Sequence, residues 1–104
     1  MLFVETPTFT KRLAGRLPED DYRRLQAELV ERPEAGTVMP RTGGARKIRW
    51  AEAGRGKSGG CRVVYYFDGV ATCHMLFVFA KNEASDLSEA QRHALHDHIQ
   101  QHLK

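Results

Sequence analysis

The sequence predicts an α+β domain, in which a twisted and mainly antiparallel β-sheet packs against an N-terminal helical hairpin and a C-terminal helix. Two observations predict this class. Apolar residues recur at helical spacing near both ends of the chain, whereas the middle shows the patterns of strands. The expected strands are short and follow one another through turns, which favours a meander with its helices on one face. At 104 residues the chain has the size of one domain, residues 1–104.

A short strand and two helices are expected first. Leu2–Glu5 has the length and apolar content of a strand, and Thr6 and Pro7 are typical of a helix N-terminus. Pro18 ends this first helix and begins a second one, whose first turn is acidic, as the helix dipole favours. The residues expected to face the sheet are Phe9, Leu13 and Leu17 in the first helix and Tyr22, Leu25 and Leu29 in the second.

Strands follow in the middle of the chain, over residues 37–39, 46–50, 61–67 and 70–80. Asp68-Gly69 predicts a hairpin with a type I′ turn, whose two central residues both need a positive φ. The unbroken apolar run 75–79 indicates a strand that is buried on both faces and therefore lies inside the sheet.

Alternation within strand 46–50 separates its side chains. Ile48 and Trp50 share one face, and Lys47 and Arg49 share the other. Arg46 falls on the side of Ile48, so it must leave the core at the strand end or find a partner.

The same alternation in strand 61–67 makes Cys61, Val63, Tyr65 and Phe67 the core set. Arg62 and Tyr66 then share the opposite face. Tyr66 is either a half-buried aromatic at the edge or part of what that face binds.

The C-terminal segment predicts a helix that begins with a capping box, Ser88 with Gln91, and continues to about Leu103. Its apolar face holds Leu95, Ile99 and Leu103. Four histidines lie in it, at 93, 96, 98 and 102. The 98–102 spacing suits a metal, but without cysteines or an HExxH motif we interpret these as surface histidines and expect no metal and no cofactor.

Composition and motifs exclude several classes of protein. No apolar run approaches the length of a membrane span, the first residues do not resemble a signal peptide, and two cysteines make no disulfide framework. A cytoplasmic protein without membrane contact is therefore expected. Gly56-Lys57-Ser58 is similar to the end of a phosphate-binding P-loop, but residue 51 is Ala where that motif needs Gly, and a strand follows instead of a helix.

The positive charge is concentrated between Arg41 and Arg62. This segment contains seven cations, six glycines and a single carboxylate, Glu52, while the whole chain has a net charge of +3. Arginine and lysine in such a cluster pair with the phosphates of a polyanion, and glycines let the backbone approach a ligand closely. A solvated hairpin without a partner is the alternative interpretation.

Three motifs in order, TGGARKIRW, GKSGGCRVVYY and KNE, make the chain similar to the RelE/HigB family of bacterial type II toxins, in particular the HigB-type branch. The resemblance extends from Phe3 to the last helix. It implies a RelE-like fold of the kind described above.

The resemblance also implies an activity and partners. Such toxins are mRNA interferases: ribosome-dependent endoribonucleases that enter the ribosomal A site, contact ribosomal RNA and cut translated mRNA without a metal. An antitoxin with a helix-turn-helix domain neutralises the toxin. Operator DNA is then contacted only through the antitoxin.

Carried onto matching positions, the resemblance implies a catalytic set of Lys57, Arg62, Lys81 and Tyr66. Arg62 would clamp the scissile phosphate, either lysine would serve as acid or base, and Tyr66 would stack on a base or orient the 2′-hydroxyl. The residues expected to grip flanking phosphates or ribosomal RNA are Arg41, Arg46, Lys47, Arg49 and Arg55.

Two alternatives stay open at the level of sequence. One is a module on the same fold that binds RNA or an antitoxin without cleaving. The other is a relative of these toxins that acts on another target, such as gyrase. The retained cations at positions 57, 62 and 81 favour the enzyme.

Overall fold

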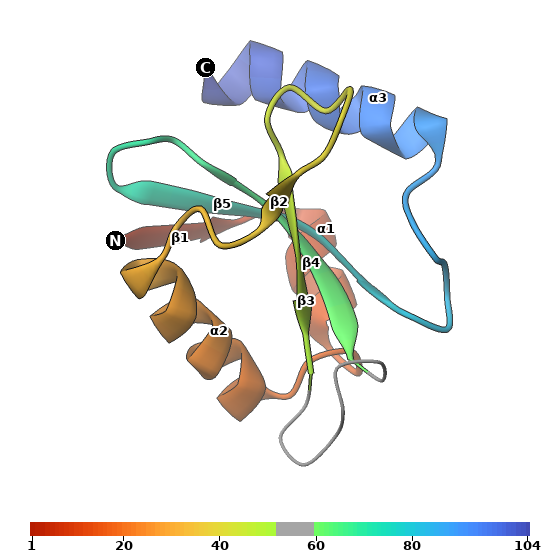
Figure 1. Cartoon of the computed structure of the whole chain (residues 1–104). Helices are drawn as coiled ribbons and strands as arrows, with labels where there is room; N and C mark the ends of the chain where they lie inside the picture. Colours follow the sequence, from red (N-terminus) through yellow and green to blue (C-terminus); the bar gives the residue numbers. More distant parts are fainter. Residues whose placement is uncertain (52–59) are drawn as a thin grey trace.

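A five-stranded sheet in the order β1-β5-β4-β3-β2 lies at the centre of a computed structural model, which describes residues 1–51 and 60–104 (Figure 1). The parallel pair β1–β5 joins the N-terminus to the sheet, and the other neighbours are antiparallel. The predicted α+β class is confirmed. The strands are β1 Leu2–Glu5, β2 Thr37–Val38, β3 Arg46–Trp50, β4 Cys61–Phe67 and β5 Thr72–Ala80.

The helices begin where the sequence signals predict. The Thr6 hydroxyl accepts a hydrogen bond from the Phe9 amide at 3.0 Å, and Ser88 and Gln91 exchange both bonds of a capping box. The first helix is one turn shorter than expected, so Leu17 is buried from the following loop. The helical segments are α1 Pro7–Leu13, α2 Glu19–Glu31, α3 Glu89–His98 and a π-helical turn, η2 Ile99–Leu103.

Helices cover both faces of the sheet, so the expectation that they lie on one face is wrong. Phe9 of α1 and Leu25 of α2 pack with Val63 on the first face. Ile99, at the start of η2, packs with Val64 on the opposite face. Because β4 and β5 present apolar side chains in both directions, either face left bare would expose core to water.

The β4–β5 hairpin also differs from the prediction. Among the described residues near this turn only Gly69 has a positive φ, +85°, which excludes the type I′ turn, and β5 begins at Thr72 instead of Val70. The Asp68 carboxylate accepts hydrogen bonds from the amides of Val70, Ala71 and Thr72 at 2.8–3.0 Å. These bonds hold a wider loop, and they lower the pKa of Asp68.

Tyr65 ties the core to the segment that leads into β2. Its buried hydroxyl donates to the Pro33 carbonyl at 2.8 Å and accepts from the Gly36 amide at 2.9 Å. A Cβ added at Gly36 would lie 2.9 Å from this ring, so only glycine fits there. The expectation that Tyr65 belongs to the core face is confirmed.

Tyr65→Phe is expected to destabilise the fold, because it leaves the Gly36 amide and the Pro33 carbonyl without this partner inside the protein. The cost should be about 1–3 kcal/mol, measured as a shift in a urea unfolding curve. Tyr66→Phe is the control, since the Tyr66 hydroxyl has no hydrogen-bond partner in the described part of the chain. Equal losses in the two variants would contradict the proposed role of the Tyr65 hydroxyl.

Candidate nucleic-acid interface

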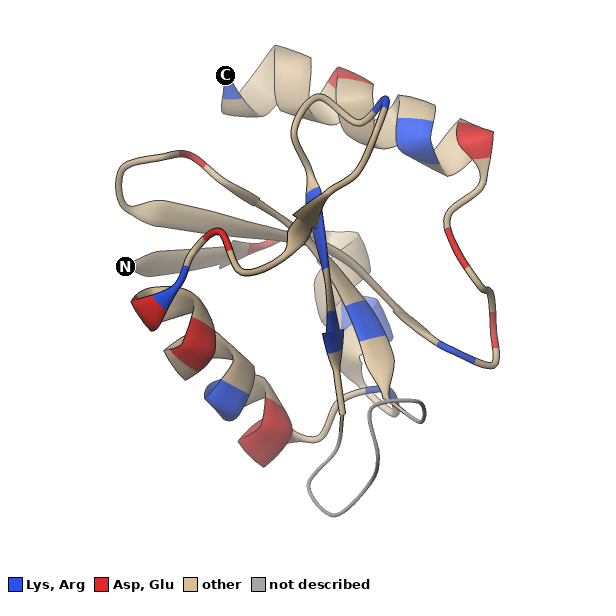
Figure 2. Ribbon diagram, in the orientation of Figure 1, with Lys and Arg blue, Asp and Glu red and all other residues tan. Residues whose placement is uncertain are grey.

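Two arginines lie opposite each other on the neighbouring strands β3 and β4, near one end of the sheet. Arg49 of β3 pairs in register with Arg62 of β4, so their side chains leave the same face. Directly opposed Cβ atoms in a sheet lie about 4.5–5.5 Å apart, and like charges at that separation destabilise the pair. Figure 2 shows these cationic positions side by side near one end of the sheet. The fold therefore holds two positive charges close together.

Arg62 is buried, and the described residues do not satisfy all of its hydrogen-bond donors. Its exposed fraction is 9%, and its Nη1 has no hydrogen-bond partner among residues 1–51 and 60–104. Buried charged groups are normally paired, because a buried donor that lacks a partner has lost its hydrogen bonds to water and gained none in the protein. Arg49 is exposed and makes no ion pair within the same described residues. An anion placed at this pair would supply the missing contacts.

Lys81 lies at the same end of the sheet. It follows Ala80, the last residue of β5, which pairs with Cys61, the neighbour of Arg62. Lys81 is exposed. The structure thus brings Arg49, Arg62 and Lys81 to adjacent ends of three neighbouring strands.

Glu83 fixes the turn that carries Lys81. Its carboxylate accepts hydrogen bonds from Arg16 at 2.6 Å, from the Ala80 amide at 2.7 Å and from Arg12 at 2.9 Å. Its own amide donates to the Ala80 carbonyl at 3.0 Å. The bonds from Arg16, the Ala80 amide and Arg12 hold the pKa of Glu83 well below its usual range. The glutamate of the KNE motif is therefore a structural clamp, a role that sequence reasoning missed.

Tyr66 lies apart from this group. It shares the face of Arg62, as predicted, but stands four residues along β4, about 13 Å away at the usual rise per residue. Its ring is half-buried, packs against the cluster around Ile99, and lies 6.4 Å from the His74 ring. The geometry favours the half-buried aromatic over a residue that touches the same phosphate as Arg62.

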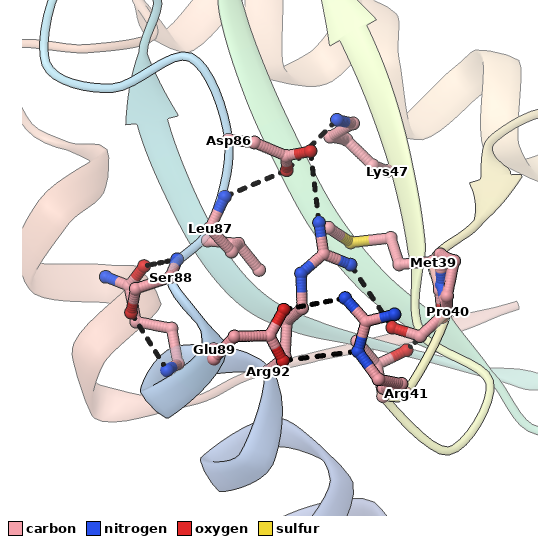
Figure 3. A network of polar contacts seen from close by, with 11 residues as sticks. Met39, Pro40, Arg41, Lys47, Asp86, Leu87, Ser88, Glu89 and Arg92 are labelled. Atoms are coloured by element: carbon pink, nitrogen blue, oxygen red, sulfur yellow. Dashed lines mark hydrogen bonds and ion pairs between the residues drawn. The ribbon is translucent and has the colours of Figure 1, made fainter.

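Lys47 belongs to a polar network under the start of α3 (Figure 3). Asp86 binds Lys47 at 3.2 Å and Arg92 at 3.0 Å, and Arg92 donates to the Pro40 carbonyl at 3.2 Å. Burial raises the pKa of Asp86, but the Leu87 amide, Lys47 and Arg92 outweigh burial and lower it. Arg92 is almost fully buried. Arg92 lies three residues before Leu95, on the apolar face of the helix, and this position could have predicted its burial from the sequence.

Arg41 and Arg46 are paired as well. Arg41 binds Glu89 of α3 at 2.6 Å. Arg46 points to the other face, where it donates to the Gly36 carbonyl at 2.8 Å and lies 3.4 Å from the Glu34 carboxylate. Arg46 has therefore found the partners that its strand position required. These contacts give Arg41, Arg46 and Lys47 structural roles, while their predicted contacts with RNA stay predictions.

Lys57 and Arg55, two of the predicted site residues, lie outside the described residues, as does the P-loop-like Gly56-Lys57-Ser58.

The histidine pair 98–102 has ring centroids 5.2 Å apart. Burial, and then the neighbouring His102 and His74, lower the pKa of His98. Among the described residues no group of three or more candidate ligands is arranged to hold a metal.

No model of a known protein family matches the sequence. Within residues 1–51 and 60–104, no helix combines the length and apolar character needed to cross a bilayer.

Glu83→Gln is expected to remove part of the acid sensitivity of the fold. A carboxylate whose pKa is lowered in the folded state stabilises the protein above its unfolded pKa, near 4.5, and this contribution is lost as the pH falls toward the folded value. Thermal unfolding measured from neutral pH downward should show a shallower loss of stability in the variant. Glu31→Gln, at the exposed end of α2, is the control and should follow the parent protein. Identical pH profiles for Glu83→Gln and the parent would contradict the clamp.

Proposed function

We propose that the protein is the toxin of a type II toxin–antitoxin pair and acts as a metal-independent, ribosome-dependent endoribonuclease on translated mRNA in the A site. The observation that carries this proposal is the Arg49–Arg62 pair, in which Nη1 of Arg62 is buried and has no hydrogen-bond partner among residues 1–51 and 60–104. Two adjacent arginines suit a phosphodiester, whose oxygens accept from planar guanidinium groups. Lys81 beside them adds a third cation. The resemblance in sequence supplies the class of reaction.

The chemistry needs little beyond fixed positive charge. The 2′-oxygen of one nucleotide attacks the adjacent phosphorus, the bond to the 5′-oxygen breaks, and a 2′,3′-cyclic phosphate and a 5′-hydroxyl remain. Negative charge builds on the phosphoryl oxygens in the transition state, so Arg62 would stabilise it more than the ground state. One proton leaves the 2′-hydroxyl and one reaches the 5′-oxygen. Lys57 and Lys81 are the candidates for these transfers.

The surroundings of the arginine pair support a preorganised site. Arg62 extends from the middle strand of the sheet, and the turn after β5 is held by the Glu83 clamp. A charged group that is already held in place and partly shielded from water needs little rearrangement of the protein or solvent during the reaction. A helix-turn-helix antitoxin is the proposed neutralising partner, in a cytoplasmic setting.

The test is induced expression followed by primer extension on a reporter mRNA. The parent protein should produce cuts inside translated codons. Lys81→Ala and Arg62→Ala should each reduce cutting by about 100-fold, the usual effect of removing one group that stabilises an anionic transition state. Lys11→Ala, an exposed change on α1, is the control and should cut like the parent.

Lys81 is exposed, so its variant keeps the test valid if Arg62→Ala does not fold. Cuts that are absent, or that persist unchanged in the double variant Arg62→Ala, Lys81→Ala, would overturn the proposal. Growth arrest with intact mRNA would indicate a non-cleaving binder or another target instead.

A further inference from the structure

A polar cleft of about 360 Å³ lies between α2 and the outer edge of β3. β2 pairs only with Arg46 and Lys47, so the second half of β3 has no neighbouring strand on this side in the described part of the chain. A free strand edge keeps backbone donors and acceptors available to a ligand. The side chains that matter for the argument are Arg24, Glu28, Arg32, Arg49 and Trp50.

Arg24 and Trp50 form a flat platform at this cleft. The guanidinium carbon of Arg24 lies 5.4 Å from the centroid of the Trp50 ring. Arg24 also binds the Asp21 carboxylate, and it donates to the Ala51 carbonyl at 3.3 Å, so its orientation is fixed. About half of the Arg24 side chain remains exposed. A planar cation that is backed by an indole ring is a surface on which a nucleobase stacks.

Arg49 connects the cleft to Arg62 around the free edge of β3, because Trp50 and Arg49 leave opposite faces of this strand. Arg49 lines the cleft and is also the cross-strand neighbour of Arg62. Both strands contribute a buried donor without a partner among the described residues, the indole Nε1 of Trp50 and Nη1 of Arg62. Arg32 lies on the opposite wall, where Glu28 pairs with it. The stacking surface therefore lies on one side of this edge and Arg62 on the other, and a strand of RNA that passes over the edge would contact both.

We infer that this cleft binds a nucleotide of single-stranded RNA that adjoins the phosphate held at Arg62. Its base stacks on Arg24 above Trp50, and its phosphate binds Arg49. An acidic peptide would use the arginines but not the flat platform. The inference rests on the proposed function for the identity of the polyanion, and either messenger or ribosomal RNA provides this chemistry.

The fluorescence of Trp50 tests the inference, because the chain contains one tryptophan. The probe is a 2′-O-methyl RNA of about 12 nucleotides, within the usual range of single-strand sites, which no 2′-hydroxyl attack can cleave. Binding should quench the fluorescence of the full-length protein. Arg24→Lys keeps the charge beside Asp21 but removes the planar group, and should weaken binding by about tenfold. Arg23→Lys, exposed on the same helix and paired with Glu19, is the control and should bind like the parent.

A second titration separates the two sources of RNA. Small ribosomal subunits without mRNA replace the oligonucleotide, and a loss of affinity in Arg24→Lys there assigns the cleft to ribosomal RNA. A loss of affinity in Arg24→Lys that is seen only with the oligonucleotide assigns the cleft to messenger RNA. Unchanged affinity of Arg24→Lys in both titrations, or equal quenching by inorganic polyphosphate, which has no bases, would overturn the inference. Because no titration depends on cleavage, failure of the cleft and failure of the proposed ribonuclease activity are distinguished.

Discussion

The middle strand β4 is the constraint on which the rest of the structure depends, because both of its faces are buried. Val63 packs toward α1 and α2, and Val64 packs toward Ile99. A strand with two apolar faces needs two layers of helices, which explains why the chain crosses from one face to the other after β5. Arg62 is a charged residue of this strand, and it lies beside Cys61 at the start of β4. The same strand thus supplies core residues and a buried cation.

The second layer is held by polar contacts as well as apolar ones. Asp86 joins Lys47 of β3 to Arg92 of α3, and Arg41 reaches Glu89 from the loop before β3 (Figure 3). Two cations of the segment from Arg41 to Arg62 therefore help to fasten α3 to the sheet. Among the described cations of this segment, Arg41, Arg46 and Lys47 are in ion pairs, whereas Arg49 makes none with a described residue. The free positive charge of the described part is therefore more local than the charge pattern suggests.

Sequence patterns predicted most elements because their signals are local: the Thr6 cap, the Ser88–Gln91 capping box and the alternation of residues 61–67. They failed where specific side-chain contacts or the packing of the whole core decide. The carboxylate of Asp68 opened the turn, and the placement of α3 on the second face depends on the core as a whole. The partners of Lys47 and Arg46 were invisible for the same reason, since Asp86 and Glu34 are far from them in the chain. Alternation did assign Arg62 to its face.

The parallel pairing of β1 with β5 affects how the chain acquires its structure. Thr6 donates to the Leu76 carbonyl, 70 residues away, and Leu2–Glu5 pairs with β5. Contacts between distant segments close large loops, which slows folding. During synthesis the first strand and the hairpin of α1 and α2 emerge long before β4 and β5, the strands against which they pack. Completion of the core, and of the cationic sheet end, must therefore wait until most of the chain has left the ribosome.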